Sequence, residues 1–263
     1  MPPGDDAPTG KMSRGSQAML LARDHTPLAV SRRLGRRPSP SYLQDFIYGA
    51  VDGAITTFAV VAGVAGAHLD ETVVIVLGGA NLLADGFSMA VSNFLGSRAE
   101  RQRRERVRRE EQLHIRLVPE GEREEIRQIF AAKGFEGRDL ERVVDVVTAD
   151  PELWAETMMS EELGFGSTEP NEFRAAFATL IAFLTVGFLP MMAFVYDLAA
   201  PGDLAHAFTW SAVMTGIAFL VVGGLKSRFV DQGWWRSALE TFVVGGLAAA
   251  LAYAAGAFLQ GVA

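Results

Sequence analysis

The chain has 263 residues and a formal net charge of -7 at pH 7. This acidic balance excludes a generally basic surface of the kind that binds nucleic acid, so we expect no nucleic-acid partner. The sequence contains no cysteine, which excludes disulfide bonds and thiolate metal sites. Any bound metal must therefore be held by carboxylate, imidazole, thioether, carbonyl or water ligands.

The first 44 residues are rich in proline, glycine, serine and arginine and show no apolar periodicity. This composition predicts a disordered, basic N-terminal tail over residues 1–44. The apolar run at 19–22 is too short for the core of a cleaved signal peptide.

Five long apolar runs follow, at about 46–67, 72–95, 173–196, 208–225 and 237–259. Each run is long enough to cross the hydrocarbon core of a bilayer as a helix. None shows the two-residue alternation of a β-barrel strand. The sequence therefore predicts an all-α integral membrane protein with five transmembrane helices, spans one and two within 45–97 and spans three to five within 173–263.

Residues 98–172 form a charged, amphipathic insert between spans two and three. We expect span two to continue as a helix to about Arg116 and a second helix to open at Pro119, because proline favours the first helical position. Apolar periodicity predicts a helix over 138–148. The Asp150-Pro151 pair predicts the start of a last helix, with aspartate as its cap.

The loops predict the orientation of the chain, because cytoplasmic loops of membrane proteins carry an excess of lysine and arginine. The N-terminal tail, the segment after span two and the loop after span four are basic, whereas the loops after spans one and three are acidic. We therefore expect the N-terminus and the insert in the cytoplasm and the C-terminus on the opposite side.

Polar residues inside the spans are the first candidates for function. Asp52 lies in span one and Asp85 in span two, where a charged side chain costs on the order of 2.5–3.5 kcal/mol and commonly marks an ion path. Asn81, Asp85 and Met89 are spaced four residues apart and share one helical face. Oxygen and thioether ligands together suit Fe(II) or Cu(I), although Met89 alone is equally well explained as packing.

The insert carries a second set of candidate ligands at helical spacing. They are Glu111, His114, Glu122, Glu125, Met158, Met159 and Glu162. Residues three or four apart share a helix face, so several such faces packed together could chelate more than one ion. A merely solvated acidic face is the alternative for the glutamates, and a packing surface for a partner subunit is the alternative for the methionine pair.

Several motifs resemble those of the vacuolar iron transporter family. They are Asp45-Phe46-Ile47-Tyr48-Gly49-Ala50-Val51-Asp52-Gly53, Ala84-Asp85-Gly86-Phe87-Ser88-Met89-Ala90, Met158-Met159-Ser160-Glu161-Glu162-Leu163-Gly164 and Gly187-Phe188-Leu189-Pro190. The resemblance covers about residue 45 to the C-terminus and leaves out only the tail.

The resemblance implies a homodimer of five-span subunits that moves cytosolic Fe(II), and also Mn(II), out of the cytosol in exchange for protons. It implies no enzymatic activity and no prosthetic group; Zn(II) and Co(II) are further candidate ions. It assigns the translocation path to Asp52 and Met89, and the insert ligands to Glu111, Glu122, Glu125, Met158, Met159 and Glu162.

The chain departs from the family pattern at two positions. Asn81 stands where family members similar to the plant and yeast transporters have glutamate, and His114 stands in place of a glutamate of the first insert helix. We hypothesise that Asp85, one turn away, takes over the role of the missing span-two glutamate.

Two other functions remain open from the sequence. Glu111 and His114 form one Glu-x-x-His pair, and a membrane-anchored di-iron ferroxidase would need two such pairs. A metal-sensing scaffold would explain the insert, but not the aspartates within the spans.

Overall fold

The structure is a computed structural model that describes residues 22, 25–34, 41–166, 170–200 and 206–261. All regular secondary structure in these residues is helical, which confirms the predicted fold class. Helix α2 (Pro27–Leu34) lies in the predicted N-terminal tail and belongs to a unit of its own, residues 1–39. The prediction of disorder for 1–21, 23–24 and 35–40 lies outside the described residues.

Five helical segments are long and apolar enough to cross a membrane, as predicted. They are α3 (Leu43–Gly66), α4 (Glu71–Leu117), the segment Glu172–Ala199, α10 (Ala207–Lys226) and α11 (Trp234–Gln260). The large apolar side chains that these helices leave exposed, such as Phe87, Leu251 and Phe258, are those that lipid accommodates. The chain is a multi-pass membrane protein.

The third span is not one uninterrupted α-helix. It consists of α8 (Glu172–Gly187), the 3-10 turn η1 (Leu189–Met191) and α9 (Met192–Ala199). Pro190 lies in this turn, and proline cannot donate the backbone hydrogen bond that an α-helix requires. The hydroxyl of Ser211 in α10 donates a hydrogen bond of 2.5 Å to the Pro190 carbonyl, which satisfies an acceptor freed by the break.

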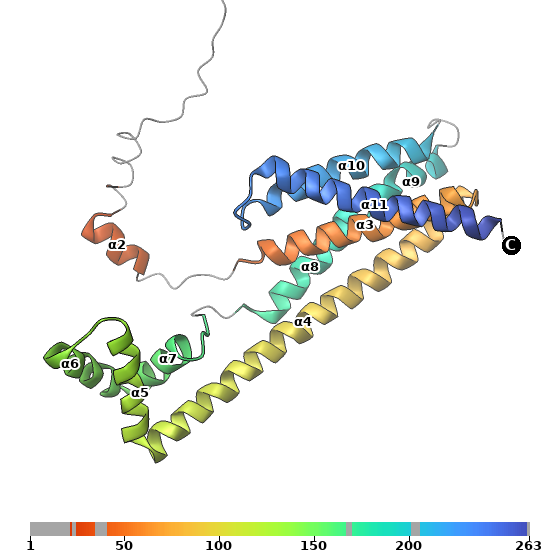
Figure 1. Ribbon diagram of the computed structural model, residues 1–263. Coiled ribbons are helices and arrows are strands. Elements are labelled where there is room, and N and C mark those ends of the chain that lie inside the picture. Colours follow the sequence, from red (N-terminus) through yellow and green to blue (C-terminus); the bar gives the residue numbers. More distant parts are fainter. Residues whose placement is uncertain (1–21, 23–24, 35–40, 167–169, 201–205, 262–263) are drawn as a thin grey trace, which may run out of the picture. The chain divides into compact units, whose positions relative to one another are not determined.

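Helix α3 lies at the centre of the spans and packs against α4, α8, α10 and α11 (Figure 1). Its glycines allow close backbone approach. A Cβ atom on Gly53 would lie 2.6 Å from the Phe183 carbonyl oxygen of α8, and one on Gly66 would lie 2.2 Å from the Tyr253 carbonyl oxygen of α11. Only glycine permits these contacts, and they fix the helix that carries Asp52.

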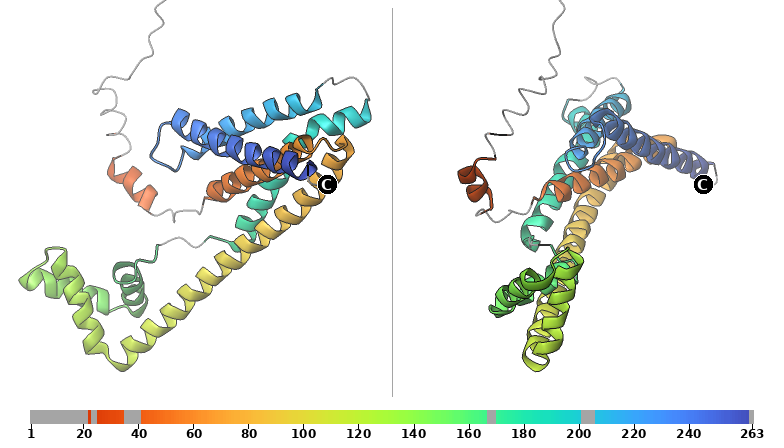
Figure 2. Two further views of the ribbon diagram at one scale, coloured as in Figure 1. Left: turned by 45° about the vertical axis from the view of Figure 1, so that its right-hand side comes forward. Right: turned by 60° about the vertical axis from the view of Figure 1, so that its left-hand side comes forward.

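Helix α4 continues from the second span into the insert without a break, as predicted, and ends at Leu117. The insert adds α5 (Pro119–Ala132), α6 (Gly137–Thr148) and α7 (Pro151–Glu161). Both predicted proline starts are confirmed, and Asp150 Oδ1 accepts a hydrogen bond of 2.9 Å from the Glu152 backbone N–H. The three helices gather at the C-terminal end of α4 (Figure 2).

The insert has an apolar core of its own, built around Ile126, Val144, Trp154 and Met158. Ile115 at the end of α4 belongs to this core, so the long helix is part of the insert as well as of the spans. Two arginines of α4 form ion pairs with other helices. Arg101 pairs with buried Glu172 of α8 at 2.9 Å, and Arg108 pairs with Glu152 of α7 within the insert.

Candidate metal centre

A group of three metal-ligating side chains forms where α4 meets α5. The carboxylates of Glu111 and Glu122 and the imidazole of His114 each offer one ligand atom, and these atoms all lie within 4.8 Å of one another. The His114 Nδ1 atom lies 3.6 Å from Glu122 Oε1. Because α4 ends at Leu117 and α5 begins at Pro119, the chain reverses abruptly and brings Glu122 back beside the last turns of α4. We call these three residues the insert triad.

Burial sets the insert triad apart from an ordinary acidic helix face. Glu111 is only 8% exposed and Glu122 only 6% exposed. Among the described residues, the buried Oε2 atom of Glu122 has no hydrogen-bond partner. An unpaired buried carboxylate oxygen is costly, and a bound cation would remove that cost. This observation favours a metal centre over the solvated face that the sequence left open.

The electrostatics of the insert triad agree with this interpretation. Burial, and after it the neighbouring carboxylates of Glu125 and Glu111, raise the pKa of Glu122 to about 7, although His114 acts in the opposite direction. Burial likewise raises the pKa of Glu111, with Glu162 as the next cause. Crowded carboxylates of this kind repel one another when ionised, and a divalent ion between them would relieve the repulsion.

Glu125 and Glu162 were predicted as further ligands, and the structure brings both into the electrostatic neighbourhood of the insert triad. Burial raises the pKa of Glu162, and Glu125 raises it next. Both residues are exposed. Their role as ligands stays a prediction.

The methionine pair is not exposed, contrary to the expectation of a surface pair. Met158 is 0% exposed and Met159 is 3% exposed. Met158 lies in the apolar core of the insert together with Ile126 and Trp154. Trp154 and Met158 are one turn apart on α7, a spacing typical of a core-facing stripe. Thioether ligation by either methionine stays a prediction.

Within the spans, Asn81, Asp85 and Met89 are half-buried on α4, and Asp52 is half-buried on the neighbouring α3. The carboxylates of Asp52 and Asp85 lie close enough to interact electrostatically. The Asn81 side-chain nitrogen is buried and, in the described part of the chain, lacks a hydrogen-bond partner. Two acidic groups and an unsatisfied amide thus occur at membrane depth, where such groups are expensive.

A polar cluster extends the face of α4 that carries Asn81, Asp85 and Met89. Asn93 donates hydrogen bonds to Asp45 Oδ1 of α3 at 2.8 Å and to Thr179 Oγ1 of α8 at 2.7 Å. Ser97, one turn further along α4, donates to Asn93 Oδ1 at 3.2 Å. The four-residue spacing of Met89, Asn93 and Ser97 was the available signal, but only the structure supplies the partners from α3 and α8.

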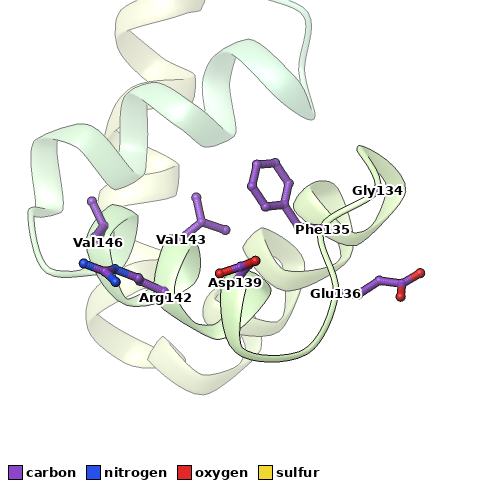
Figure 3. Close-up of a pocket in the computed structure, with 7 residues that line it drawn as sticks. All are labelled: Gly134, Phe135, Glu136, Asp139, Arg142, Val143 and Val146. Carbon is purple, nitrogen blue, oxygen red and sulfur yellow. The ribbon is translucent and has the colours of Figure 1, made fainter.

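A separate hollow of about 380 Å³ lies over α6 and the loop before it. Figure 3 shows the apolar side chains of Phe135, Val143 and Val146 along it, with Glu136 directed away from the other side chains. Its acidic groups do not converge as those of the insert triad do, so it offers no comparable ligand set.

Comparison with known proteins assigns the chain to a family. The profile of the VIT family matches residues 43–257, which include the insert and the spans except for the last three residues of α11. The chain belongs to the VIT family. This family match confirms the resemblance that the sequence motifs indicated.

Curated members of the VIT family are similar over most of their length. The vacuolar iron transporter of Toxoplasma gondii is 32% identical over 230 residues, which cover 84% of this chain and 76% of the relative. Vacuolar iron transporter 1 of Arabidopsis thaliana is 32% identical over 80% of this chain and 83% of its own length. The vacuolar iron transporter of Plasmodium berghei is 29% identical over 83% and 82%. These relatives are named as transporters, in agreement with the expectation that the chain is not an enzyme.

Proposed function

We propose that this VIT family protein exports Fe(II) from the cytosol across a membrane, accepts Mn(II) as well, and exchanges the metal for protons. In this proposal the protein works as a homodimer, with the N-terminus and the insert in the cytoplasm and the C-terminus on the other side. The relatives named as vacuolar iron transporters support iron as the cargo.

The observation that carries the proposal is the sharing of α4 by two sets of candidate ligands. Glu111 and His114 of the insert triad lie near its C-terminal end, and Asp85 and Met89 lie in its membrane-spanning part. A metal-sensing scaffold needs only the first set. The aspartates within the spans are explained by an ion that passes through them.

The insert would collect the ion first. Carboxylate oxygens and an imidazole nitrogen suit a divalent ion such as Fe(II), and ionised Glu111 and Glu122 would replace part of its hydration shell. The ion would then reach the spans, where Asp52 and Asp85 supply charge and Met89 supplies a thioether.

Proton exchange would follow from the same carboxylates. A carboxylate must lose its proton to ligate a metal, so metal binding at Asp52 or Asp85 would release a proton, and protonation from the far side would release the metal. Asp85, one turn from Asn81, would carry the proton in place of the missing span-two glutamate. Metal flux and proton flux would thereby be linked through shared groups.

The test is metal uptake by proteoliposomes that contain the purified full chain, with and without a pH gradient. We expect Fe(II) uptake that a pH gradient accelerates and that Asp52→Ala abolishes, while Asp85→Asn removes the effect of the gradient. Fe(II) uptake that ignores the gradient would contradict proton exchange. Oxygen consumption on adding Fe(II), without uptake, would favour the di-iron ferroxidase.

A further inference from the structure

We propose that His114 is the residue that sets the metal selectivity of the insert triad, favouring nitrogen-preferring ions such as Co(II) and Zn(II) over Mn(II). This inference rests on the proposed metal centre and specifies which ions it prefers. Its basis is the position of one imidazole among the crowded carboxylates.

The geometry gives His114 a distinct place among the three side chains. Glu111 and Glu122 are almost fully buried, whereas the His114 side chain is 55% exposed. The imidazole therefore lies on the solvent side of the two buried carboxylates, with its Nδ1 atom 3.6 Å from Glu122 Oε1. An ion bound to Glu122 Oε2 would also be coordinated by the imidazole of His114. The imidazole would be its ligand on the side that faces solvent.

The chemistry of the donor atoms determines which ions bind more tightly. Affinity for a mixed nitrogen and oxygen site rises from Mn(II) through Fe(II) and Co(II) to the later divalent ions, and imidazole suits these later ions. Carboxylate and water ligands suit Mn(II), so a third carboxylate in place of the imidazole would reduce the preference for Co(II) over Mn(II). A glutamate at position 114 has comparable reach and adds a negative charge, which makes it a direct test of nitrogen against oxygen.

The exposure of His114 makes the test practical, because its replacement opens no cavity in the insert core. Full-length protein in detergent is titrated with Co(II) and Mn(II) separately and in competition, and the visible absorption of bound Co(II) reports whether nitrogen is coordinated. Wild type, His114→Glu, Glu122→Gln and Glu120→Gln are compared. Glu120 is an exposed acid in the first turn of α5 and serves as the matched control.

We expect His114→Glu to lower the ratio of Co(II) to Mn(II) affinity by about tenfold or more, because the nitrogen ligand that suits Co(II) is lost, and even loss of an outer-shell partner of a ligand costs about tenfold or more in metal affinity. It should also shift the Co(II) absorption, while Glu120→Gln changes neither. An unchanged ratio in His114→Glu, with Glu122→Gln weakening both ions, would overturn the inference and leave the metal centre intact. If Glu122→Gln changes nothing, the proposed centre fails as well.

Discussion

Replacing Glu122 with glutamine should stabilise the metal-free insert at alkaline pH while it weakens metal binding. Glutamine keeps the shape of the side chain and removes the charge. The pKa of Glu122 is raised from 4.5 to about 7, and at about 1.4 kcal/mol per pKa unit this rise corresponds to about 3.5 kcal/mol of unfavourable free energy in the ionised folded state. Water that reaches the exposed His114 beside Glu122 screens part of this penalty. We therefore expect Glu122→Gln to raise the free energy of unfolding of the insert by about 2 kcal/mol.

The direction of the pH dependence follows from proton linkage. The folded insert binds a proton at Glu122 more tightly than the unfolded chain does, so the free energy of unfolding falls as the pH rises from about 4.5 to about 7. Below this window Glu122 is protonated in both states, so the free energies of unfolding of wild type and Glu122→Gln differ little. Above it the full difference between wild type and Glu122→Gln is present.

Amide hydrogen exchange of the full chain in detergent measures this difference, because it reports opening of the insert alone. At pH 8, without metal, we expect about 30-fold slower opening of α5 in Glu122→Gln than in wild type, the factor that 2 kcal/mol gives. At pH 4, below the window, the two proteins should match, and Glu120→Gln should not be protected at either pH. Equal protection of wild type and Glu122→Gln at pH 8 would refute the idea that ionised Glu122 destabilises the metal-free insert.

Three further outcomes follow from the structure. Metal affinity of the insert should rise with pH up to about 7 and then level off, because protonated Glu122 cannot ligate; calorimetric titrations between pH 5 and 8 check this, and a flat profile would contradict it. Arg101→Gln should cost about 2 kcal/mol, since it leaves buried Glu172 without its partner at 2.9 Å, which would appear as a lower Tm than that of the control Arg106→Gln at an exposed pair. Gly53→Leu should prevent correct packing of α3 on α8, because even its Cβ would lie 2.6 Å from a backbone oxygen; a monodisperse variant as thermostable as wild type would contradict it.

The helices could be predicted because their signals are local. Long apolar runs gave the five spans, and prolines and capping residues gave the starts of α5 and α7. The break in the third span was missed, although Pro190 was visible in the sequence. A run of apolar residues indicates length and depth, but not whether the neighbouring helices can satisfy the backbone at a proline.

The candidate metal centre could be predicted only in its parts. Helical spacing gave Glu111 with His114, but the angle at which the chain turns between Leu117 and Pro119 decides whether Glu122 joins them. The burial of Met158 shows the same limit, because the sequence did not reveal which face of α7 meets the core. Helical spacing placed Asn93 on the same face of α4 as Met89, but its hydrogen-bond partners lie on two other helices and could not be predicted from that spacing.

The continuity of α4 also constrains how the proposed transporter must work. At about 1.5 Å per residue, Met89 and Glu111 lie about 33 Å apart along the helix axis. An ion cannot pass between ligands over that distance in one step. Within one subunit, metal bound at the insert triad therefore cannot transfer directly to the ligands of the spans. The insert would act by raising the local concentration of metal, and the polar cluster around Asn93 is the next group along the same face of α4. Capture and passage are then separable steps, with capture governed by Glu111, His114 and Glu122 and passage governed by the carboxylates within the spans.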